Sequence, residues 1–556
     1  MKFRLASCIV SVSVAGLISC SDSSVETNQT QKSHQETHQA EKNSVKQQTA
    51  SHEFDKLLPP EPSMPEQICT ELKANLKYVN WVLPDEVDHD PKNSSPDSSR
   101  LQQAMDNCPA GQAVKLITDN GNNAFLAGPL RIPSGVTLWV DKDVKLFASR
   151  SPADYDLGDG VCGDALPDIK NRCEPWIYAK NTENSGIVGE GTIDARGGSV
   201  LTSGKRAYQT TWWDLSMQSK AKPKLEQNNP RMIQIDDSKN FTFYKINLQN
   251  GAKFHVGTKR NDGLTFWGIK LLTPSLAYTN PGYQCAEEDM PAPGKLDKPS
   301  TCFIPELVKN TDGIDPGTSK NVTVAYSFIS TGDDNVAIKS GDDDNKPASQ
   351  NHLYAHNHFY YGHGMSIGSE TDAGVDNIKV WDLTLDGMDS GHGVGIRIKS
   401  DGKRGGDITN VTYDNVCMRR AKDALVFTPY YSSTKSDKLP PKMENIVLKN
   451  FHYIDYPGAK YNEALVNISG YQSGELINPL KLTLDNVVFD TMPEIRDNKH
   501  YKHHHIQYTF GPRAVKNFPD REQADISVKD MQTLPAEPIE CSDERFVKFP
   551  AVDSPI

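Results

Sequence analysis

Asn321-Val-Thr-Val-Ala-Tyr-Ser, residues 321–327, shows the pattern that decides the fold. An Asn or Gly is followed by apolar residues at every second position and then by a polar turn. Alternation with a period of two is typical of a β-strand, and Val, Ile, Phe and Thr favour strands. Similar stretches begin at Asn240, Gly263, Asn351, Asn377, Asn410, Asn445 and Lys481.

These stretches recur at short intervals, such as 23 residues from 240 to 263 and 35 residues from 410 to 445. Short strands that repeat roughly every 20–50 residues, with no helical pattern between them, indicate a solenoid. We therefore predict an all-β fold, a right-handed parallel β-helix. Asp97-Ser98-Ser99-Arg100, followed by Leu101 to Asn107, predicts a short helix that covers the N-terminal end of the solenoid.

Residues 1–19 are typical of a bacterial lipoprotein signal peptide. Two basic residues precede an apolar run from Leu5 to Ile18, which is too short to span a membrane. Leu17-Ile18-Ser19-Cys20 resembles the lipobox, whose cysteine is lipidated, and Ser21 favours the outer membrane in such proteins. We expect an outer-membrane lipoprotein anchored at Cys20, facing the periplasm or the outside. An ordinary secretory peptide would instead give a secreted protein.

The segment 20–55 is polar, and between Ser21 and Glu53 it contains no Leu, Ile, Phe, Tyr or Trp. Such a segment cannot bury enough apolar surface to offset its ordering entropy, so we predict a disordered tether. Residues 56–556 then form a single folded domain with a C-terminal tail.

The cysteines and the net charge indicate the compartment of the protein and exclude one class of function. Eight cysteines remain after Cys8 and Cys20 are assigned to the signal and the lipid, which favours disulfides in an oxidising compartment. The 72 acidic residues exceed the 60 Lys and Arg, giving a net charge of −12, which excludes a general nucleic-acid binder. Neighbours in sequence suggest the pairs Cys69–Cys108, Cys162–Cys173 and Cys285–Cys302, whereas Cys417 either pairs with Cys541 or is a buried thiol.

Four polar clusters interrupt the apolar strands at intervals close to one coil, 21 to 34 residues. Equivalent positions on successive coils lie about 4.8 Å apart, so these side chains should converge on one face. The clusters are Asn310-Thr311-Asp312, Asp333-Asp334, Gly362-His363-Gly364 and Arg397-Ile398-Lys399.

The chemistry of this set fits the hydrolysis of a glycosidic bond in an acidic sugar. One carboxyl group must protonate the leaving oxygen, and another must activate water, about 6.5–9.5 Å away in an inverting enzyme. Clustered acids raise the pKa of one member, which keeps a proton available. Arg397 and Lys399 suit a substrate carboxylate.

The ordered clusters resemble the signature of glycoside hydrolase family 28, the polygalacturonases, over about residues 69–490. The resemblance implies hydrolysis of polygalacturonate with inversion. We also expect a monomer that needs no cofactor or metal. Asp333 would be the general acid, and Asp312 and Asp334 would hold and deprotonate the attacking water. His363 would support the protonation state of the acid or bind the sugar, and Arg397 and Lys399 would bind the galacturonate carboxylate. Tyr431, or Tyr430 in its place, would contact the sugar, and Asn310 would line the same site, where it orders the turn rather than performs chemistry.

Several alternatives stay open at this point. A pectate lyase shares the β-helix, although lyases use calcium and an Arg base, and a non-catalytic carbohydrate-binding β-helix would not need Asp333. An insertion at 278–308 either closes one end of the cleft, which favours exo cleavage, or lies away from it. Asp342-Asp343-Asp344-Asn345 is interpreted as an acidic turn rather than a calcium site, and Gly364-Met-Ser-Ile-Gly368 lacks the helix that a nucleophile elbow requires.

Overall fold

The computed structural model describes residues 53–341, 348–432, 438–496, 504–518 and 525–556. Leu57–Ile556 form one compact unit. The predicted signal peptide, Cys20 and residues 20–52 of the predicted tether lie outside the described residues, as does the whole acidic turn at 342–345. No helix in the described part of the chain is long and apolar enough to cross a membrane.

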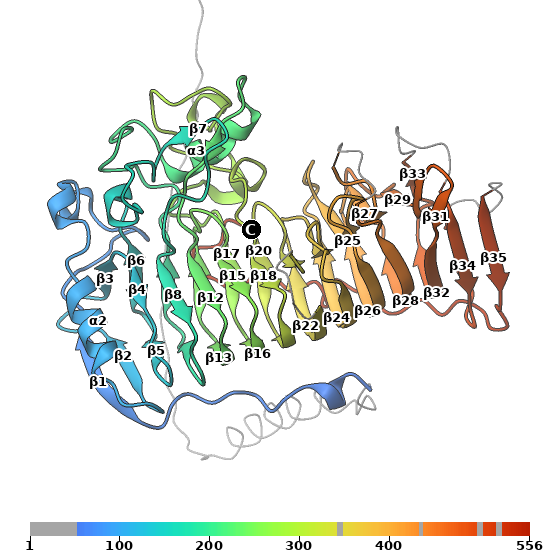
Figure 1. The fold of residues 1–556 in the computed structure, drawn as a ribbon, viewed down its shortest axis with the longest axis horizontal. Coiled ribbons are helices and arrows are strands. Elements are labelled where there is room, and N and C mark those ends of the chain that lie inside the picture. Colours follow the sequence, from blue (N-terminus) through green and yellow to red (C-terminus); the bar gives the residue numbers. More distant parts are fainter. Residues whose placement is uncertain (1–52, 342–347, 433–437, 497–503, 519–524) are drawn as a thin grey trace, which may run out of the picture. The chain divides into compact units, whose positions relative to one another are not determined.

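The folded unit is a right-handed parallel β-helix, as the repeat predicts, and Figure 1 shows its coils stacked side by side. One large sheet contains, within the described residues, β1 (Ile68–Lys73), β2 (Ala113–Ile117), β3 (Ala124–Ala127), β5 (Thr137–Val140), β6 (Lys145–Ala148), β9 (Gly186–Val188), β10 (Thr192–Asp194), β13 (Lys239–Tyr244), β14 (Asn247–Gln249), β16 (Asp262–Trp267), β17 (Lys270–Leu272), β19 (Lys320–Ala325), β20 (Phe328–Ser330), β22 (Ser349–Phe359), β24 (Val375–Asp386), β26 (Asp407–Arg419), β28 (Lys442–Tyr453), β32 (Leu480–Phe489), β34 (Ile506–Phe510) and β35 (Ile526–Asp530).

A second sheet runs along the same coils, and we call it the cleft sheet. It consists of β4 (Leu130–Arg131), β8 (Ile177–Lys180), β12 (Ile233–Asp236), β15 (Val256–Lys259), β18 (Ile314–Gly317), β21 (Val336–Ile338), β23 (Met365–Ile367), β25 (Val394–Lys399), β27 (Asp423–Thr428), β29 (Leu465–Ile468) and β33 (Glu494–Ile495). Small antiparallel pairs are β7 (Ala165–Leu166) with β11 (Glu226–Gln227), and β30 (Tyr471–Ser473) with β31 (Leu476–Asn478).

Helices are short in the described residues. The two α-helices are α2 (Ser98–Asp106) and α3 (Trp212–Ser216). The 3-10 helices are Asp55–Leu57, Asp85–Val87, Pro91–Asn93, Pro152–Asp154, Met217–Lys220, Pro281–Tyr283, Glu287–Asp289 and Pro305–Leu307.

The helix predicted after Asp97 is α2, and its sequence explains which face is buried. Leu101 and Met105 are spaced by four residues, so they share one face, and both pack in the main core with Val114 of β2. In Figure 1, α2 lies beside the first strands of the solenoid. Its role as a cover for the open end stays a prediction.

The repeated Asn residues mark backbone bends. Asn321, Asn351 and Asn377 have φ angles of 55°, 61° and 56°, the left-handed region that Asn and Gly tolerate best. They are stacked in register, and the Asn351 side chain donates to Asn321 and receives a bond from Asn377. The recurring Asn of the sequence is therefore required by a turn of each coil.

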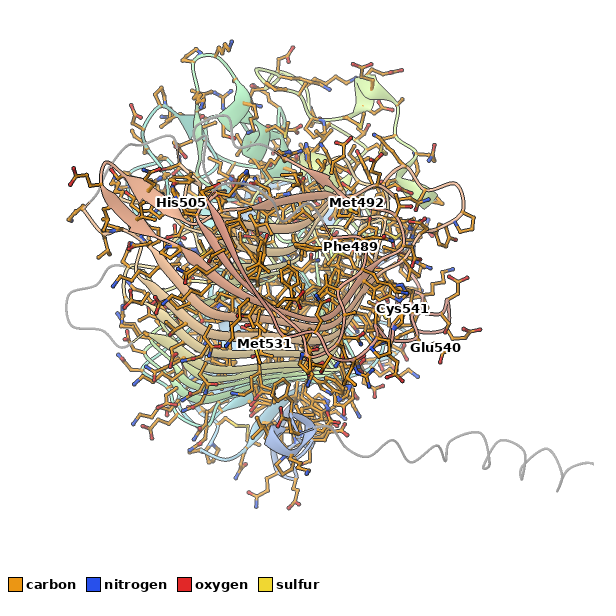
Figure 2. All side chains as sticks on the ribbon, turned by 90° about the vertical axis from the view of Figure 1, so that its right-hand side faces the viewer. Phe489, Met492, His505, Met531, Glu540 and Cys541 are labelled. Atoms are coloured by element: carbon orange, nitrogen blue, oxygen red, sulfur yellow. A yellow bond between two sulfur atoms is a disulfide. The ribbon has the colours of Figure 1, made fainter. Side chains whose placement is uncertain are left out.

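Four disulfides join the cysteines that the sequence assigns to the folded domain. The three predicted pairs are present, and Cys417 is bonded to Cys541, which settles the alternative in favour of a disulfide. In the end-on view of Figure 2, Phe489 lies within the coils whereas Glu540 and Cys541 lie at their periphery. The Cys417–Cys541 bond thus fastens the C-terminal tail to β26.

Candidate active site

The cleft sheet places three of the predicted residues in line. Ile314, Val336 and Met365 are paired in register on β18, β21 and β23. Asp312, Asp334 and His363 each lie two residues before one of these strands, so they occupy equivalent positions on three successive coils. Asp333 precedes Asp334 on the middle coil.

The predicted one-coil step from His363 to Arg397 differs from the structure. Arg397 of β25 pairs with Ser366, three residues after His363, because the coil from Met365 to Ile396 is shorter than the predicted interval. The long side chains of Arg397 and Lys399 reach back and bind Asp334, with Lys399 Nζ 2.6 Å from Asp334 Oδ2. Side-chain length thus compensates for the change in register.

Asp334 is the centre of the hydrogen-bond network. Its Oδ1 accepts bonds from Arg397 and from the hydroxyl of Ser366 at 3.0 Å, and Oδ2 accepts from Lys399. Burial alone would raise the pKa of Asp334, but Arg397 and Lys399 hold it below the ordinary value. Asp334 is therefore a fixed anion.

Asp333 is the most exposed carboxylate of the three. Its side chain is 18% exposed, against 6% for Asp312 and 2% for Asp334. His363 Nδ1 lies 3.0 Å from Asp333 Oδ1, and the backbone N–H of Asn310 donates to Oδ2 at 3.1 Å. Burial opposes ionisation, but His363, Lys399 and Arg397 together lower the pKa of Asp333.

Asp312 has the opposite electrostatic environment. Burial and the nearby charges of Asp315 and Asp333 raise its pKa well above the ordinary value, although Lys339 Nζ lies 3.7 Å away. Lys339 binds Asp315 more closely, at 2.6 Å, and burial still raises the pKa of Asp315 to about 6. Asp312 Oδ1 is buried without a hydrogen-bond partner among the described residues, so this oxygen can accept a bond from a substrate or water.

Tyr431 and Asn310 occupy different settings at the site. Tyr431 is exposed, and Lys399 Nζ lies 5.2 Å from the centroid of its ring. The Asn310 side chain accepts a bond from Gln227 at 2.6 Å, so its backbone, rather than its amide group, contacts Asp333.

The inserted segment 278–308 folds against the loops that precede the cleft strands. Ser300 binds the α3 residue Asp214, and Phe303 packs on Trp213. At the end of the insertion Glu306 binds Ser390, which precedes β25. The segments before β18 and β25, which have β21 and β23 between them in the cleft sheet, are thereby joined along one side of the site.

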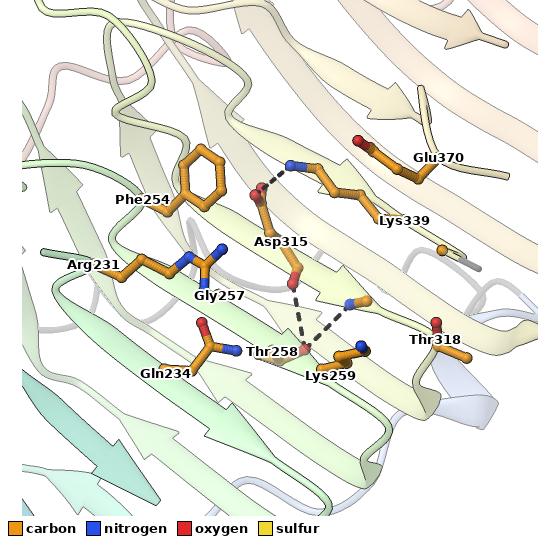
Figure 3. A pocket seen from close by; sticks show the side chains of 12 residues that line it. Arg231, Gln234, Phe254, Gly257, Thr258, Lys259, Asp315, Thr318, Lys339 and Glu370 are labelled. Carbon is orange, nitrogen blue, oxygen red and sulfur yellow. Dashed lines mark hydrogen bonds and ion pairs between the residues drawn. The ribbon is translucent and has the colours of Figure 1, made fainter. Parts of the chain in front are cut away.

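A pocket of about 210 Å³ extends the site along earlier strands of the cleft sheet (Figure 3). Arg231 and Phe254 lie two residues before β12 and β15, in the row that continues to Asp312. Three cations surround the Phe254 ring: Lys339 at 4.5 Å, Arg231 at 5.6 Å and Lys253 at 5.7 Å from its centroid. The pocket therefore joins an aromatic surface to positive charge next to the carboxylates.

The potential ligand atoms of Asp333, Asp334 and His363 lie within 4.8 Å of one another, close enough to surround a metal ion. Both oxygens of Asp334 already bind Arg397 or Lys399, however, and these fixed cations balance its charge. The donor set is therefore suited to proton transfer and anion binding rather than to a dedicated metal cage.

Residues 123–487 match the family described as glycosyl hydrolases family 28. The chain belongs to this family. It is 50% identical over 470 residues to a polygalacturonase of Ralstonia solanacearum, covering 83% of this chain and 86% of that one. It is 38% identical over 395 residues to an endo-polygalacturonase of Pectobacterium carotovorum subsp. carotovorum, covering 71% and 84%.

The fold is also similar to solved structures. A polygalacturonase from Erwinia carotovora ssp. carotovora superposes with a TM-score of 0.60 at 32% identity, covering 86% of this chain and 99% of that one. An exopolygalacturonase from Thermotoga maritima, at a TM-score of 0.51 and 16% identity, shares the fold. In the present structure, the four sequence clusters that resemble the family 28 signature lie together in one site.

Sequence reasoning did not select Ser366, Lys339 or Asp315 as parts of the site. Ser366 lies in the middle of β23, between two parallel strands, which explains why its G-x-S-x-G context is not a nucleophile elbow. The sequence did contain a signal for Ser366: it lies three residues after His363, between two apolar residues of a strand, so its side chain points away from the core. Lys339 and Asp315 lie on adjacent coils, and only their pairing in space shows that they influence Asp312.

Proposed function

We propose that this family 28 protein is a polygalacturonase that hydrolyses α-1,4-galacturonosidic bonds of polygalacturonate with inversion. The observation that carries the proposal is the arrangement of Asp333, Asp312 and Asp334 on adjacent coils, with Arg397 and Lys399 beside them. Two carboxyl roles and a binding site for a uronate carboxylate are thereby available in one cleft. The names of the relatives support the same substrate class.

Asp333 acts as the proton donor in this proposal because it is the exposed member of the cluster. In the free protein its pKa is lowered by His363, Lys399 and Arg397. A substrate carboxylate bound to the two cations adds a negative charge that offsets theirs, which raises the pKa of Asp333 toward the protonated form. His363, 3.0 Å away, shares the proton with Asp333. Binding of an acidic sugar thus prepares the acid.

Asp312 and Asp334 hold the attacking water, and they divide the work. Both oxygens of Asp334 already accept hydrogen bonds, so Asp334 orients the water as a fixed negative charge. Asp312 Oδ1 has no such bond among the described residues, so it is the oxygen that can accept a proton from the water. The raised pKa of Asp312 makes it a stronger base once ionised. The water attacks the anomeric carbon while Asp333 protonates the leaving oxygen, which inverts the configuration.

Arg397 and Lys399 bind the galacturonate carboxylate at the cleavage position. Arg397 keeps donors beyond those used for Asp334 and Ser366, because a guanidinium carries five N–H groups. Tyr431, beside Lys399, offers a ring face to the sugar. Asn310 contributes through its backbone bond to Asp333 rather than by direct sugar contact.

The test is the product formed from polygalacturonate. Hydrolysis should release reducing ends of inverted configuration, which NMR measures. It should not form the unsaturated sugar that absorbs ultraviolet light. An unsaturated product would mean a lyase, and no product would support a binding protein. The sizes of the oligomers released at early times decide the mode of action: mixed sizes mean endo cleavage, and monomer or dimer alone means exo cleavage.

We further propose that the protein is monomeric and attached to the bacterial outer membrane only through lipid on Cys20. The support is the lipobox-like sequence at residues 17–20 and the polar segment that follows it. Substitution of Cys20 by Ser should move the protein from the membrane fraction to the soluble fraction. Sedimentation of the Cys20→Ser variant as a dimer would contradict the monomer.

A further inference from the structure

A second groove lies outside the cleft sheet. It has a volume of about 540 Å³ and crosses the large sheet, where Lys145, Thr192, Asn247, Lys270 and Phe328 are in register on β6, β10, β14, β17 and β20. Four strand spacings of about 4.8 Å give this row a length of about 19 Å. We call this the lysine groove. Its length along the coils is sufficient for a short oligosaccharide.

The cations of the lysine groove differ in how they are neutralised. Lys145 is buried with Asp194 and Asp553, and Lys245 is paired with Glu61. The side-chain ammonium group of Lys270, by contrast, has neither an ion pair within 4.0 Å nor a hydrogen bond among the described residues, and its backbone N–H binds Ile246.

Burial lowers the pKa of Lys270, and Glu190 only partly offsets this effect. Asp143 is the other exposed acid of the groove, and Lys142 is an exposed base next to it. A half-buried ammonium group that lacks a close counterion gains stability from an incoming anion. The carboxylate of a uronic acid is such an anion.

Aromatic residues line the groove near both of its ends. Tyr326 is 42% exposed and lies between Trp267 and His356, with ring centroids 5.0 and 4.7 Å away, and it stacks on His356. Trp81 lies in the tight turn between Val79 and Val82, and its carbonyl accepts a bond from Lys145. Rigid rings supply apolar surface for the C–H faces of sugar rings with little loss of side-chain entropy.

We propose that the lysine groove is a second, non-catalytic binding site for a uronic-acid oligosaccharide. The choice of ligand rests on the proposed function, because a galacturonan carries one carboxylate per sugar. Lys270 and Lys142 bind carboxylates, and Trp81 and Tyr326 pack on sugar rings. Since the groove and the catalytic cleft lie on different sheets, one polymer chain held at the groove raises the concentration of polymer near the cleft.

The test uses polymer binding in a catalytically silent background, Asp333→Asn, so that it does not depend on turnover. Retention of the full-length protein is measured by electrophoresis in gels containing polygalacturonate. Lys270→Ala should raise the dissociation constant for the polymer at the groove about ten-fold, because it removes one charge-assisted contact. Lys142→Glu should also weaken binding of the polymer, and Trp81→Ala should weaken it by loss of ring contact. Lys529→Ala, on exposed β35, is the matched control and should change nothing.

A second measurement separates this proposal from the proposed function. With Asp333 intact, Lys270→Ala should hydrolyse trigalacturonate at the wild-type rate and lose efficiency only on the long polymer. If the wild type hydrolyses neither substrate, the proposed function fails while the binding test still stands. Retention of Lys142→Glu, Lys270→Ala and Trp81→Ala equal to that of Lys529→Ala would overturn the lysine groove. Equal weakening on a neutral galactan gel would also overturn it, because the site would not recognise carboxylates.

Discussion

Lys399 and Asp334 form a buried ion pair in which Lys399 Nζ lies 2.6 Å from Asp334 Oδ2, with 7% and 2% of their side chains exposed. The pair joins the proposed carboxylate-binding cation to the carboxylate that orients the water. Removal of either partner leaves a buried charge uncompensated, which destabilises proteins by about 3–5 kcal/mol. Substitutions of Lys399 therefore mix folding with catalysis, and sharper tests use other residues.

Asp333→Asn should abolish proton donation without loss of folding. We expect kcat on polygalacturonate to fall by about 10²- to 10⁴-fold, the contribution of a positioned general acid. The assay counts reducing ends, with thermal unfolding measured in parallel. Asp106→Asn, at an exposed position at the end of α2, is the matched control. A wild-type rate for Asp333→Asn would falsify the assignment of the acid.

Ser366→Ala should lower kcat through its neighbours. The hydroxyl links Asp334 Oδ1 and Arg397 Nε, with both distances 3.0 Å. Its removal loosens their mutual orientation, and we expect about a ten-fold loss of kcat, since a hydrogen bond to a charged group contributes about 1.5 kcal/mol or more. Stopped assays over a range of substrate concentrations separate kcat from KM. A complete loss of activity would instead indicate that Ser366 is a nucleophile, and Ser366→Thr should recover much of the activity.

Arg231→Ala should affect long substrates more than short ones. Arg231 lies beside Phe254 at the end of the row that begins with the carboxylates (Figure 3). A polymer that extends from the cleavage position reaches it, whereas digalacturonate does not. We expect about a ten-fold loss of kcat/KM on polygalacturonate and none on the dimer. Arg513→Ala, in the C-terminal region, serves as the control, and equal losses on both substrates would argue against a subsite here.

His352→Gln should flatten the dependence of stability on pH. Burial lowers the pKa of His352 to about 4, whereas the unfolded value is near 6.5. Between pH 4 and 6.5 the unfolded state therefore binds a proton at His352 that the folded state does not bind. The contribution of His352 to the free energy of unfolding is fully present above pH 6.5 and is lost as the pH falls toward 4. The slope in this window is at most about 1.4 kcal/mol per pH unit for one group.

The comparison uses urea unfolding of the wild type and His352→Gln between pH 4 and 7. Asp312 and Asp315, whose pKa values are raised, contribute slopes of opposite sign in both proteins, so they cancel in the difference. The difference between the two free energies of unfolding should change across the window. Parallel curves would show that His352 does not titrate differently on unfolding.

Replacement of Cys417 and Cys541 by Ser should destabilise the protein. The bond closes a loop of 124 residues, for which chain entropy predicts up to about 5 kcal/mol. The Cys162–Cys173 bond spans 11 residues, so its removal is the control and should cost less. Chemical unfolding under non-reducing conditions measures both. Equal losses would mean that loop length does not set the effect.

The charge of the whole chain gives a poor picture of its affinity for a polyanion. The net charge is −12, yet Arg231, Lys253 and Lys339 surround one ring in the cleft. Local cations fixed near a site act at short range, whereas the field of distant acids is screened beyond about 8–10 Å at physiological salt. Composition therefore excluded nucleic acid more reliably than it excluded an acidic polysaccharide.

The sequence by itself determined the solenoid and the identity of the clustered residues. Alternating apolar positions specify strands, and Asn residues such as Asn351 occur where each coil needs a left-handed bend, so both signals are local. The approximate period of the strands then places Asp312, Asp334 and His363 on neighbouring coils.

The tertiary structure alone decided how these residues interact. It shifted Arg397 by three positions relative to His363, placed Ser366 between Arg397 and Asp334, and joined Cys417 to Cys541. It also formed the lysine groove from strands of five different coils. Exact register, side-chain reach and burial depend on contacts between residues far apart in the chain, and no local sequence pattern encodes these contacts.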